Sequence, residues 1–312
     1  MTALAAFVWG ASVLVGLLVL RTQLRTQAQR HEREAENLHR LEQQVQDRTA
    51  ELAKRNEDLE RLNRKLEDAS LTDSLTGLSN RRFLTAQMPQ DVAVVDRYYR
   101  RLDANRSPPL PGNRPDLALM MIDLDGLKRI NDHYGHAAGD RALLQVCEVL
   151  KRACRKSDTV ARWGGDEFLV VARGVEADVV ELLAERIRKA VAEHEVEVSP
   201  GRFVQLGCSI GFALYPFLPA APTHLSWEQV GTIADRALYA AKSSGRNAWV
   251  GLFGTAQTPL EDTISLINQR PDELAREGAL EVSSSLAERT ALVWERRVVP
   301  RESEPLVVGP SR

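Results

Sequence analysis

Two pairs of acidic side chains stand at the ends of apolar runs and could bind a metal ion. Asp123 and Asp125 close the apolar run 117–122. If that run is a β-strand, a spacing of two places both carboxylates on one face of its end. Asp166 and Glu167 follow a Gly-Gly pair between two further apolar runs, where a tight hairpin would bring them beside the first pair. Clustered carboxylates are what Mg²⁺ requires to hold a nucleoside triphosphate, although each pair alone could equally be a solvated turn.

A third polar cluster, residues 131–140, contains two glycines and lies between two predicted helices. Asn131 and Asp140 together offer donor and acceptor edges that suit a purine. A carboxylate can accept two hydrogen bonds from guanine, one from N1–H and one from the N2 amino group. Asp140 could equally be no more than the N-cap of the helix that follows.

The predicted strands and helices that must position these groups indicate one α/β (α+β) domain. Strand-like apolar runs alternate with helical patterns in the order strand, helix, two strands, helix, strand, with one further helix and strand after them. This order favours a ferredoxin-like βαββαβ core, with an antiparallel-rich sheet covered on one face by helices. The long strand 204–214 and the helices 139–154, 177–194 and 226–243 belong to it. The proline-rich segment 108–115 is a loop before the first core strand.

Composition excludes several classes of protein. The 312 residues carry 41 basic and 43 acidic side chains, a balance that argues against a nucleic-acid-binding protein with a basic surface. A hydrophobic content of 44% excludes a disordered chain. The cysteines, Cys147, Cys154 and Cys208, form no CxxC pair, so we interpret them as reduced, cytosolic core residues.

The N-terminal part predicts a membrane anchor followed by a long helix. Residues 1–20 are uncharged and mostly apolar, and arginines follow them, so we expect a single transmembrane helix with everything after it in the cytoplasm. A buried hairpin helix is the alternative. Residues 21–70 carry eleven basic and eleven acidic side chains and apolar residues at a seven-residue period, which predicts a parallel coiled coil. A single solvated helix is the alternative there.

Five motifs in order make the chain resemble the GGDEF family of diguanylate cyclases. Residues Gly164–Phe168 have the sequence Gly-Gly-Asp-Glu-Phe, which is the signature of the family. The five segments are Asp73–Arg82, Asp123–Lys128, Asn131–Asp140, Gly164–Phe168 and Ala241–Asn247. The similarity covers residues 71–252, and we assign residues 71–254 as the GGDEF domain. Residues 255–312 are expected to be a weakly structured tail.

The resemblance implies roles for individual residues. Asp123, the carbonyl of Leu124, Asp166 and Glu167 would bind Mg²⁺ or Mn²⁺, and Asp166 or Glu167 would be the catalytic proton acceptor. The expected substrate-binding residues are Asn131, His136 and Asp140 for the guanine, and Lys128, Lys242 and Arg246 for the phosphates.

The resemblance also implies a reaction and its partners. Two GTP molecules would be joined into cyclic di-GMP with release of two pyrophosphates, and two domains would have to meet as a homodimer. Arg155 and Asp158, with Arg186, match the family's inhibitory product site. The expected location is the cell inner membrane, single-pass, with the catalytic domain cytoplasmic and no nucleic-acid partner. The alternative is a domain without turnover that serves as a GTP or cyclic di-GMP receptor.

Overall fold

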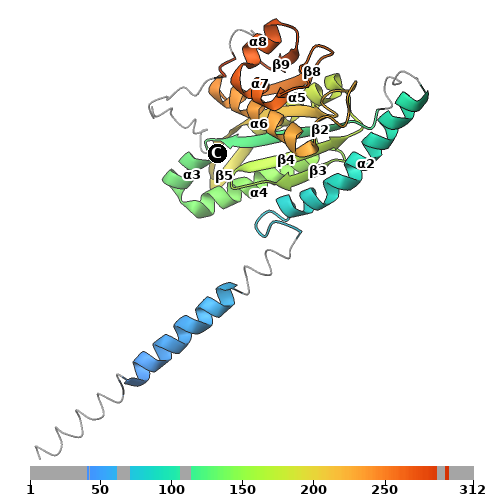
Figure 1. The fold of residues 1–312 in the computed structure, drawn as a ribbon. Helices are drawn as coiled ribbons and strands as arrows, with labels where there is room; N and C mark the ends of the chain where they lie inside the picture. Colours follow the sequence, from blue (N-terminus) through green and yellow to red (C-terminus); the bar gives the residue numbers. More distant parts are fainter. Residues whose placement is uncertain (1–40, 42, 62–70, 106–113, 287–291, 295–312) are drawn as a thin grey trace, which may run out of the picture. The chain divides into compact units, whose positions relative to one another are not determined.

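The structure is a computed structural model that describes residues 41, 43–61, 71–105, 114–286 and 292–294 (Figure 1). The chain divides into two units, residues 1–70 and 71–312, and each is described by itself. Among the described residues, no helix combines the length and the apolar content needed to cross a bilayer. The predicted transmembrane helix over residues 1–20 lies outside the described residues.

The described part of the first unit is α-helical, at residue 41 and over residues 43–61. Val45, Leu52 and Leu59 lie seven residues apart and are 61–66% exposed, and Leu41 is exposed as well. Residues seven apart fall on one stripe of a helix. This helix therefore presents a row of large apolar side chains to solvent, at the positions that the heptad pattern predicts.

The second unit is a mixed α+β domain built around a central sheet (Figure 1). Its strands are β1 (Ser79–Asn80), β2 (Leu117–Asp125), β3 (Thr159–Arg162), β4 (Glu167–Arg173), β5 (Glu195–Ser199), β6 (Arg202–Gln205), β7 (Gly207–Tyr215), β8 (Trp249–Gly254) and β9 (Leu280–Ser284). Its helices are α2 (Arg81–Asn105), α3 (Leu127–Tyr134), α4 (His136–Ala153), α5 (Ala177–Ala192), α6 (Trp227–Ser243), α7 (Thr263–Gln269) and α8 (Pro271–Arg276).

The sheet has the strand order β1-β3-β4-β2-β7-β8-β9 within the described residues. β2 is antiparallel to both β4 and β7, and β3 is antiparallel to β4. The inner order β3-β4-β2-β7, with α4 and α5 as the connecting helices, is that of the predicted βαββαβ core. One strand was predicted too long. Residues 204–214 are not continuous, because β6 pairs with β5 in a separate two-stranded sheet before β7 begins at Gly207.

Helices cover both faces of the sheet, so the prediction of helices on one face is wrong. Along β2, one set of alternate side chains packs with α4 and α5, and the other set packs with α2 and α6. Every residue of 117–124 is buried. A strand that is apolar at every position, and not only at alternate positions, is typical of a sheet covered on both sides.

Close contact between α6 and the sheet depends on a glycine in β7. A Cβ built on Gly211 would lie 1.8 Å from the backbone nitrogen of Leu238, so no larger residue fits there. The start of α6 is fixed by a capping box between Ser226 and Gln229. Helix α6 is therefore held tightly at its start and middle, and its last turn carries Lys242.

Residues 88–105, to which no helix or strand was assigned from the sequence, are the greater part of helix α2. The hydroxyl of Tyr99 donates to the buried carboxylate of Asp116, 2.9 and 3.0 Å from its two oxygens. Tyr215 likewise donates to Asp96 at 3.0 Å. Burial raises the pKa of Asp116 to about 6. These contacts attach α2 to the sheet.

The expectation of a weakly structured tail from residue 255 is wrong for residues 255–286. Two short helices, α7 and α8, follow β8, and β9 then pairs antiparallel with β8 from Val250 to Gly254. Leu280 and Val282 of β9 are buried. Strand β9 has only five residues, and alternation over so short a run is too weak a signal to find from the sequence.

Candidate functional site

The end of β2 carries the first predicted carboxylate. Asp123 is only 8% exposed, and the sheet register places it opposite Glu167 of β4 and Ser209 of β7. Residues directly opposite in an antiparallel pair lie on the same face. From α6, the Nζ of Lys242 approaches the Oδ2 of Asp123 to 2.7 Å. The structure therefore joins a predicted metal ligand to a predicted phosphate-binding lysine.

Burial and neighbouring charges perturb the carboxylates at this end of β2. Burial raises the pKa of Asp123 to about 6, with Lys242 acting against the shift and Asp166 and Asp125 adding to it. Burial also raises the pKa of Asp125, whose oxygens accept hydrogen bonds from the Ser209 hydroxyl at 2.9 and 3.1 Å. The carboxylates at this end of β2 are thus desolvated, and the nearby cations compensate their negative charge only in part.

The Gly-Gly turn brings the second pair of carboxylates to the same place. β3 and β4 form the predicted antiparallel hairpin, with Asp166 in the turn and Glu167 as the first residue of β4. The backbone nitrogen of Leu124 donates to the carbonyl of Asp166 at 3.2 Å, which holds the turn against the end of β2.

A cavity of about 270 Å³ lies beside this turn, between α3 and α4. It is lined by five predicted site residues, namely Lys128, Asn131, His136, Asp140 and Asp166, together with Leu127, Gly139, Leu143, Arg162 and Gly165. A Cβ built on Gly139 would lie 1.9 Å from the Oδ1 of Asn131. Only glycine at that position of α4 allows the amide of Asn131 to occupy its place in the cavity wall.

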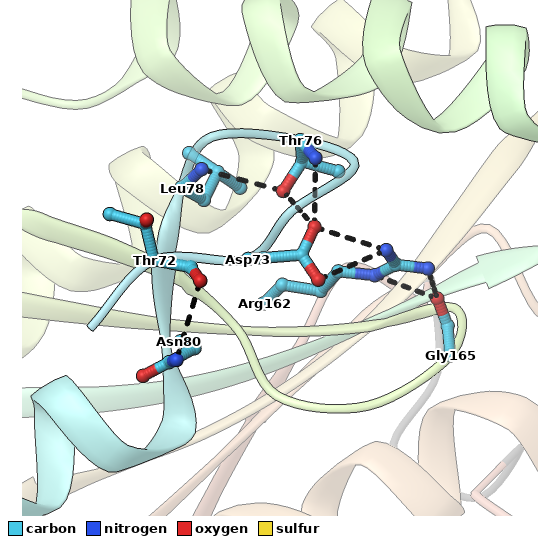
Figure 2. A network of polar contacts seen from close by, with 7 residues as sticks. All are labelled: Thr72, Asp73, Thr76, Leu78, Asn80, Arg162 and Gly165. Carbon is cyan, nitrogen blue, oxygen red and sulfur yellow. Dashed lines mark hydrogen bonds and ion pairs between the residues drawn. The ribbon is translucent and has the colours of Figure 1, made fainter. Parts of the chain in front are cut away.

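Arg162 ties the Gly-Gly turn to the start of the domain (Figure 2). Its Nη2 and Nε donate to the carbonyl of Gly165 at 2.8 and 3.2 Å, and its Nη1 lies 3.1 and 3.2 Å from the two carboxylate oxygens of Asp73. Asp73 also accepts from the backbone nitrogen and the hydroxyl of Thr76, at 2.8 and 2.6 Å. Burial favours a higher pKa for Asp73, but these hydrogen bonds and the Arg162 charge outweigh it and lower the pKa.

The remaining predicted residues lie on neighbouring elements. Arg246 is in the loop after α6, where its φ is 62°, and its charge acts on Asp125. Asp158 accepts a hydrogen bond from the backbone nitrogen of Arg155 at 2.8 Å, in the turn after α4. Burial raises the pKa of Cys154 to about 12, and the charges of both Asp158 and Arg186 act on the same thiol. Asp158 and Arg186 therefore lie close enough for their charges to act on Cys154, and Arg155 contacts Asp158 through its backbone.

The fit of the site to a divalent cation depends on its donor chemistry. Among the described residues, no three His, Cys, Asp or Glu side chains are gathered closely enough to form a metal cluster. Asp123 and Glu167 nevertheless face the same side of the sheet, and the raised pKa of Asp123 reflects burial and repulsion among carboxylates. Hard oxygen donors with excess negative charge suit Mg²⁺ or Mn²⁺, so the residues fit such an ion.

Sequence reasoning missed three contributors to the site. Arg162 lines the cavity and holds the turn, Gly139 makes room for Asn131, and Ser209 holds Asp125. Arg162 stands two residues before the Gly-Gly pair, a position from which a hairpin strand can reach its own turn. The roles of Gly139 and Ser209 depend on packing between distant segments, which no local pattern reveals.

Comparison with known proteins agrees with the motifs. The family model "Diguanylate cyclase, GGDEF domain" matches residues 70–248. Diguanylate cyclase A of Treponema denticola is 42% identical over 132 residues, 42% of this chain and 34% of that protein. The bifunctional diguanylate cyclase/cyclic di-GMP phosphodiesterase MucR of Pseudomonas aeruginosa is 31% identical over 242 residues, 76% of this chain and 31% of that protein.

A solved structure is also similar. It is the coiled coil and GGDEF domain of DgcB from Caulobacter crescentus in complex with c-di-GMP, 28% identical, with a TM-score of 0.45 over 66% of this chain and 96% of that one. The chain spans about a third of the length of the two curated relatives. The family model matches more than half of the 312 residues. The chain therefore belongs to the GGDEF-domain diguanylate cyclase family.

Proposed function

We propose that the protein is a diguanylate cyclase, which condenses two GTP molecules into cyclic di-GMP and releases two pyrophosphates. The observation that carries this proposal is the cavity between α3 and α4, which gathers Asn131, Asp140 and Asp166. The first two are suited to the edge of a guanine, and the third belongs to the acidic site at the end of β2. A base-binding cavity beside an acidic phosphate site is what a nucleotidyl transfer requires.

The reaction forms one phosphodiester bond for each nucleotide. The 3′-hydroxyl oxygen of one GTP attacks the α-phosphorus of the other, the bond from that phosphorus to the bridging oxygen breaks, and pyrophosphate leaves. The proton of the 3′-hydroxyl passes to Asp166 or Glu167. Two such transfers, one in each direction, close the cyclic product. Asn131 and Asp140 orient the base, and Lys242 and Arg246 bind the phosphates.

The acidic groups would hold a divalent cation through Asp123, the carbonyl of Leu124, Asp166 and Glu167. When bound, such an ion supplies positive charge to the triphosphate and lowers the energy of the displaced oxygen. In the protein as described, the ammonium of Lys242 already neutralises part of the charge on Asp123, 2.7 Å away. This lysine is placed to exchange a carboxylate partner for a phosphate partner.

The assay is cyclic dinucleotide formation by the purified chain with GTP and Mg²⁺. Asp140→Asn should raise KM for GTP by about tenfold or more, because an amide cannot accept both guanine hydrogen bonds. Asp132→Asn is the matched control, because Asp132 is exposed and does not line the cavity. Tight GTP binding without turnover would instead identify a receptor and refute the enzyme.

We further propose that the protein acts as a homodimer joined by the coiled coil predicted over residues 21–70. The support is the row of exposed apolar side chains at Val45, Leu52 and Leu59, which a second copy would bury. Pairing would raise the local concentration of the second domain to roughly millimolar. Leu52→Glu with Leu59→Glu should give a monomer in sedimentation and abolish turnover while GTP binding survives. Ala53→Glu, off the stripe, is the control, and full turnover by the monomer would refute the proposal.

Product inhibition through Arg155, Asp158 and Arg186 is a separate proposal. Its support is that Asp158 contacts the backbone of Arg155 and acts with Arg186 on Cys154, and that guanidinium groups can bind phosphate and stack on guanine. Arg155→Ala should relieve inhibition by cyclic di-GMP, whereas Lys156→Ala, the exposed neighbour, should leave it in place. An unchanged inhibition curve for Arg155→Ala would exclude this site.

The proposed location is the inner membrane, with a single span over residues 1–20 and the domain in the cytoplasm. The support is the uncharged apolar run followed by arginines. Cell fractionation tests it, because a chain without residues 1–20 should move from the membrane fraction to the soluble fraction. Recovery of the whole chain in the soluble fraction would refute the anchor.

A further inference from the structure

The loop that follows α6 has an unusual backbone. Gly245, Arg246 and Asn247 have φ angles of 119°, 62° and 43° in succession. Residues other than glycine rarely adopt positive φ, and each such residue costs on the order of 1 kcal/mol. The segment keeps this conformation only if its surroundings hold it.

Part of the support comes from the core of the domain. The backbone nitrogen of Asn247 donates to Asp125 at 2.9 Å, and Arg188 of α5 donates to the carbonyl and the side-chain oxygen of Asn247 at 3.4 and 3.3 Å. The loop therefore touches the acidic site directly through Asp125. A shift of the loop would move Arg246 and would change the contacts of the carboxylates.

The rest of the support comes from the segment after β8. At the start of the loop, the hydroxyl of Ser244 accepts a hydrogen bond from the backbone nitrogen of Val293 at 2.7 Å. Two residues beyond the loop, at the first residue of β8, Trp249 exchanges two hydrogen bonds with Ser285. Its nitrogen donates to the Ser285 hydroxyl at 2.9 Å, and its carbonyl accepts from the Ser285 nitrogen at 3.1 Å. These contacts hold the chain at the start of the loop and just after it.

Packing strengthens this attachment. The Trp294 side chain is buried, and its ring lies 5.5 Å from the guanidinium carbon of Arg236 on α6. The same guanidinium lies 5.5 Å from the ring of Tyr239. Strand β9 completes the attachment by pairing with β8. The family model ends at residue 248, so it does not account for these elements.

We propose that residues 255–286 and 292–294 form a clamp that positions the loop Ser244–Asn247 for binding of a nucleoside triphosphate. The inference rests on the proposed function, because it takes the phosphates of GTP as the group that Lys242 and Arg246 meet. Ser285 and Trp294 are positioning residues in this scheme, since they act through the loop. The guanine cavity, formed by α3 and α4, is built without them.

The test compares two ligands on the full chain. Isothermal titration with 3′-deoxy-GTP, which lacks the attacking hydroxyl, measures triphosphate binding without turnover, and guanosine measures base binding alone. Ser285→Ala should weaken the affinity for 3′-deoxy-GTP roughly fivefold, which is the effect of one lost hydrogen bond. The affinity for guanosine should stay within about twofold of the wild-type value. KM for GTP should rise more than kcat falls. Ser284→Ala is the matched control, because Ser284 is the neighbouring serine and lies opposite Val250 in the β8–β9 pair, away from Trp249.

Trp294→Ala with Ser285→Ala should enlarge the loss, and the unfolding temperature of each variant shows whether the fold survives. Wild-type affinity for 3′-deoxy-GTP in both variants would overturn the clamp. An equal loss of affinity for guanosine would also overturn it, because the substitutions would then disturb the whole domain and not the loop alone. If the wild-type chain binds nucleotide but forms no cyclic product, the proposed function fails while the binding comparison still tests the clamp. If the wild-type chain does not bind 3′-deoxy-GTP, both fail.

Discussion

Replacing Arg162 with lysine tests whether the Gly-Gly turn must be tied to the start of the domain. The guanidinium reaches the carbonyl of Gly165 and both oxygens of Asp73 at once (Figure 2). A lysine keeps the charge but is a single point donor on a flexible stem, so it can hold one of the two partners and not both. Arg162→Lys should therefore release either the turn or the segment around Asp73.

The magnitude follows from the contacts that are lost. A hydrogen bond to a charged group contributes roughly 1.5 to 3 kcal/mol. The side chains of Arg162 and Asp73 are 16% and 21% exposed, so solvent screening places the loss near the lower end. We expect a loss of about 2 kcal/mol in the free energy of unfolding. If the same energy is needed to place Asp166 and Glu167, kcat falls roughly thirtyfold.

The assay is cyclase turnover at saturating GTP, measured together with denaturant unfolding. Arg173→Lys is the matched control. Arg173 binds the carboxylate of Asp91 with a similar fork and is 24% exposed, but it lies at the end of β4 away from the Gly-Gly turn. Both variants should lose comparable stability, and only Arg162→Lys should lose most of its turnover.

Equal turnover in the two variants would refute the reasoning, because the arginine would then act only on the fold. Asp73→Asn supplies an independent check: it keeps an acceptor for Thr76 but removes the charge that faces Arg162. In a double-mutant cycle, Asp73→Asn and Arg162→Lys should show a coupling of about 1 kcal/mol or more, whereas independent sites would give additive losses.

Two further predictions concern the cavity and the attachment of α2. Gly139→Ala should raise KM for GTP about tenfold, because its Cβ would displace Asn131, while Gly231→Ala, a helical glycine facing open space, should add about 1 kcal/mol of stability in denaturant unfolding. Asp116→Asn should stabilise the protein at pH 7 by up to about 3 kcal/mol, because Asp116 has a pKa of about 6 when folded, above its unfolded value, and its charged form is disfavoured by burial. The native state binds the proton more tightly, so wild-type stability should fall as the pH rises from about 4 to about 6, and the difference from Asp116→Asn should vanish near pH 4. A stability difference that does not depend on pH would contradict this assignment. Tyr99→Phe, in contrast, should lower the free energy of unfolding, because it removes the hydroxyl that donates to Asp116.

The core of the fold was predictable because its signals are local. The run 117–122 is apolar at every position, and the helical patterns between the runs have the length and period of amphipathic helices. Because this run is apolar at every position, it also indicates a sheet that is covered on both faces, and the prediction of helices on one face did not take this into account. Strand β9 was not predictable, because its partner β8 lies across two helices and the strand itself is short.

Residue type and motif were enough to nominate the candidate site residues, but not to find the residues that support them. The sequence placed Asp123 and Asp166 in one acidic site, and the structure links their segments through Leu124. Nothing local indicates that Lys242 pairs with Asp123, 119 positions earlier, or that Asp73 holds Arg162. Such contacts depend on the tertiary arrangement, and the backbone strain at Arg246 depends on it as well.

The burial of β2 has a consequence for how the site moves. This strand is paired along its whole length with β7 and through Asp123 with β4, and residues 117–124 are all buried. Its amide protons should exchange with solvent only when the entire domain unfolds. We therefore expect Asp123 to stay in place while the elements around it, namely α3, the Gly-Gly turn and the loop Ser244–Asn247, open and close. Hydrogen-exchange mass spectrometry would show whether the amides of β2 exchange more slowly than those of α3 and the Gly-Gly turn.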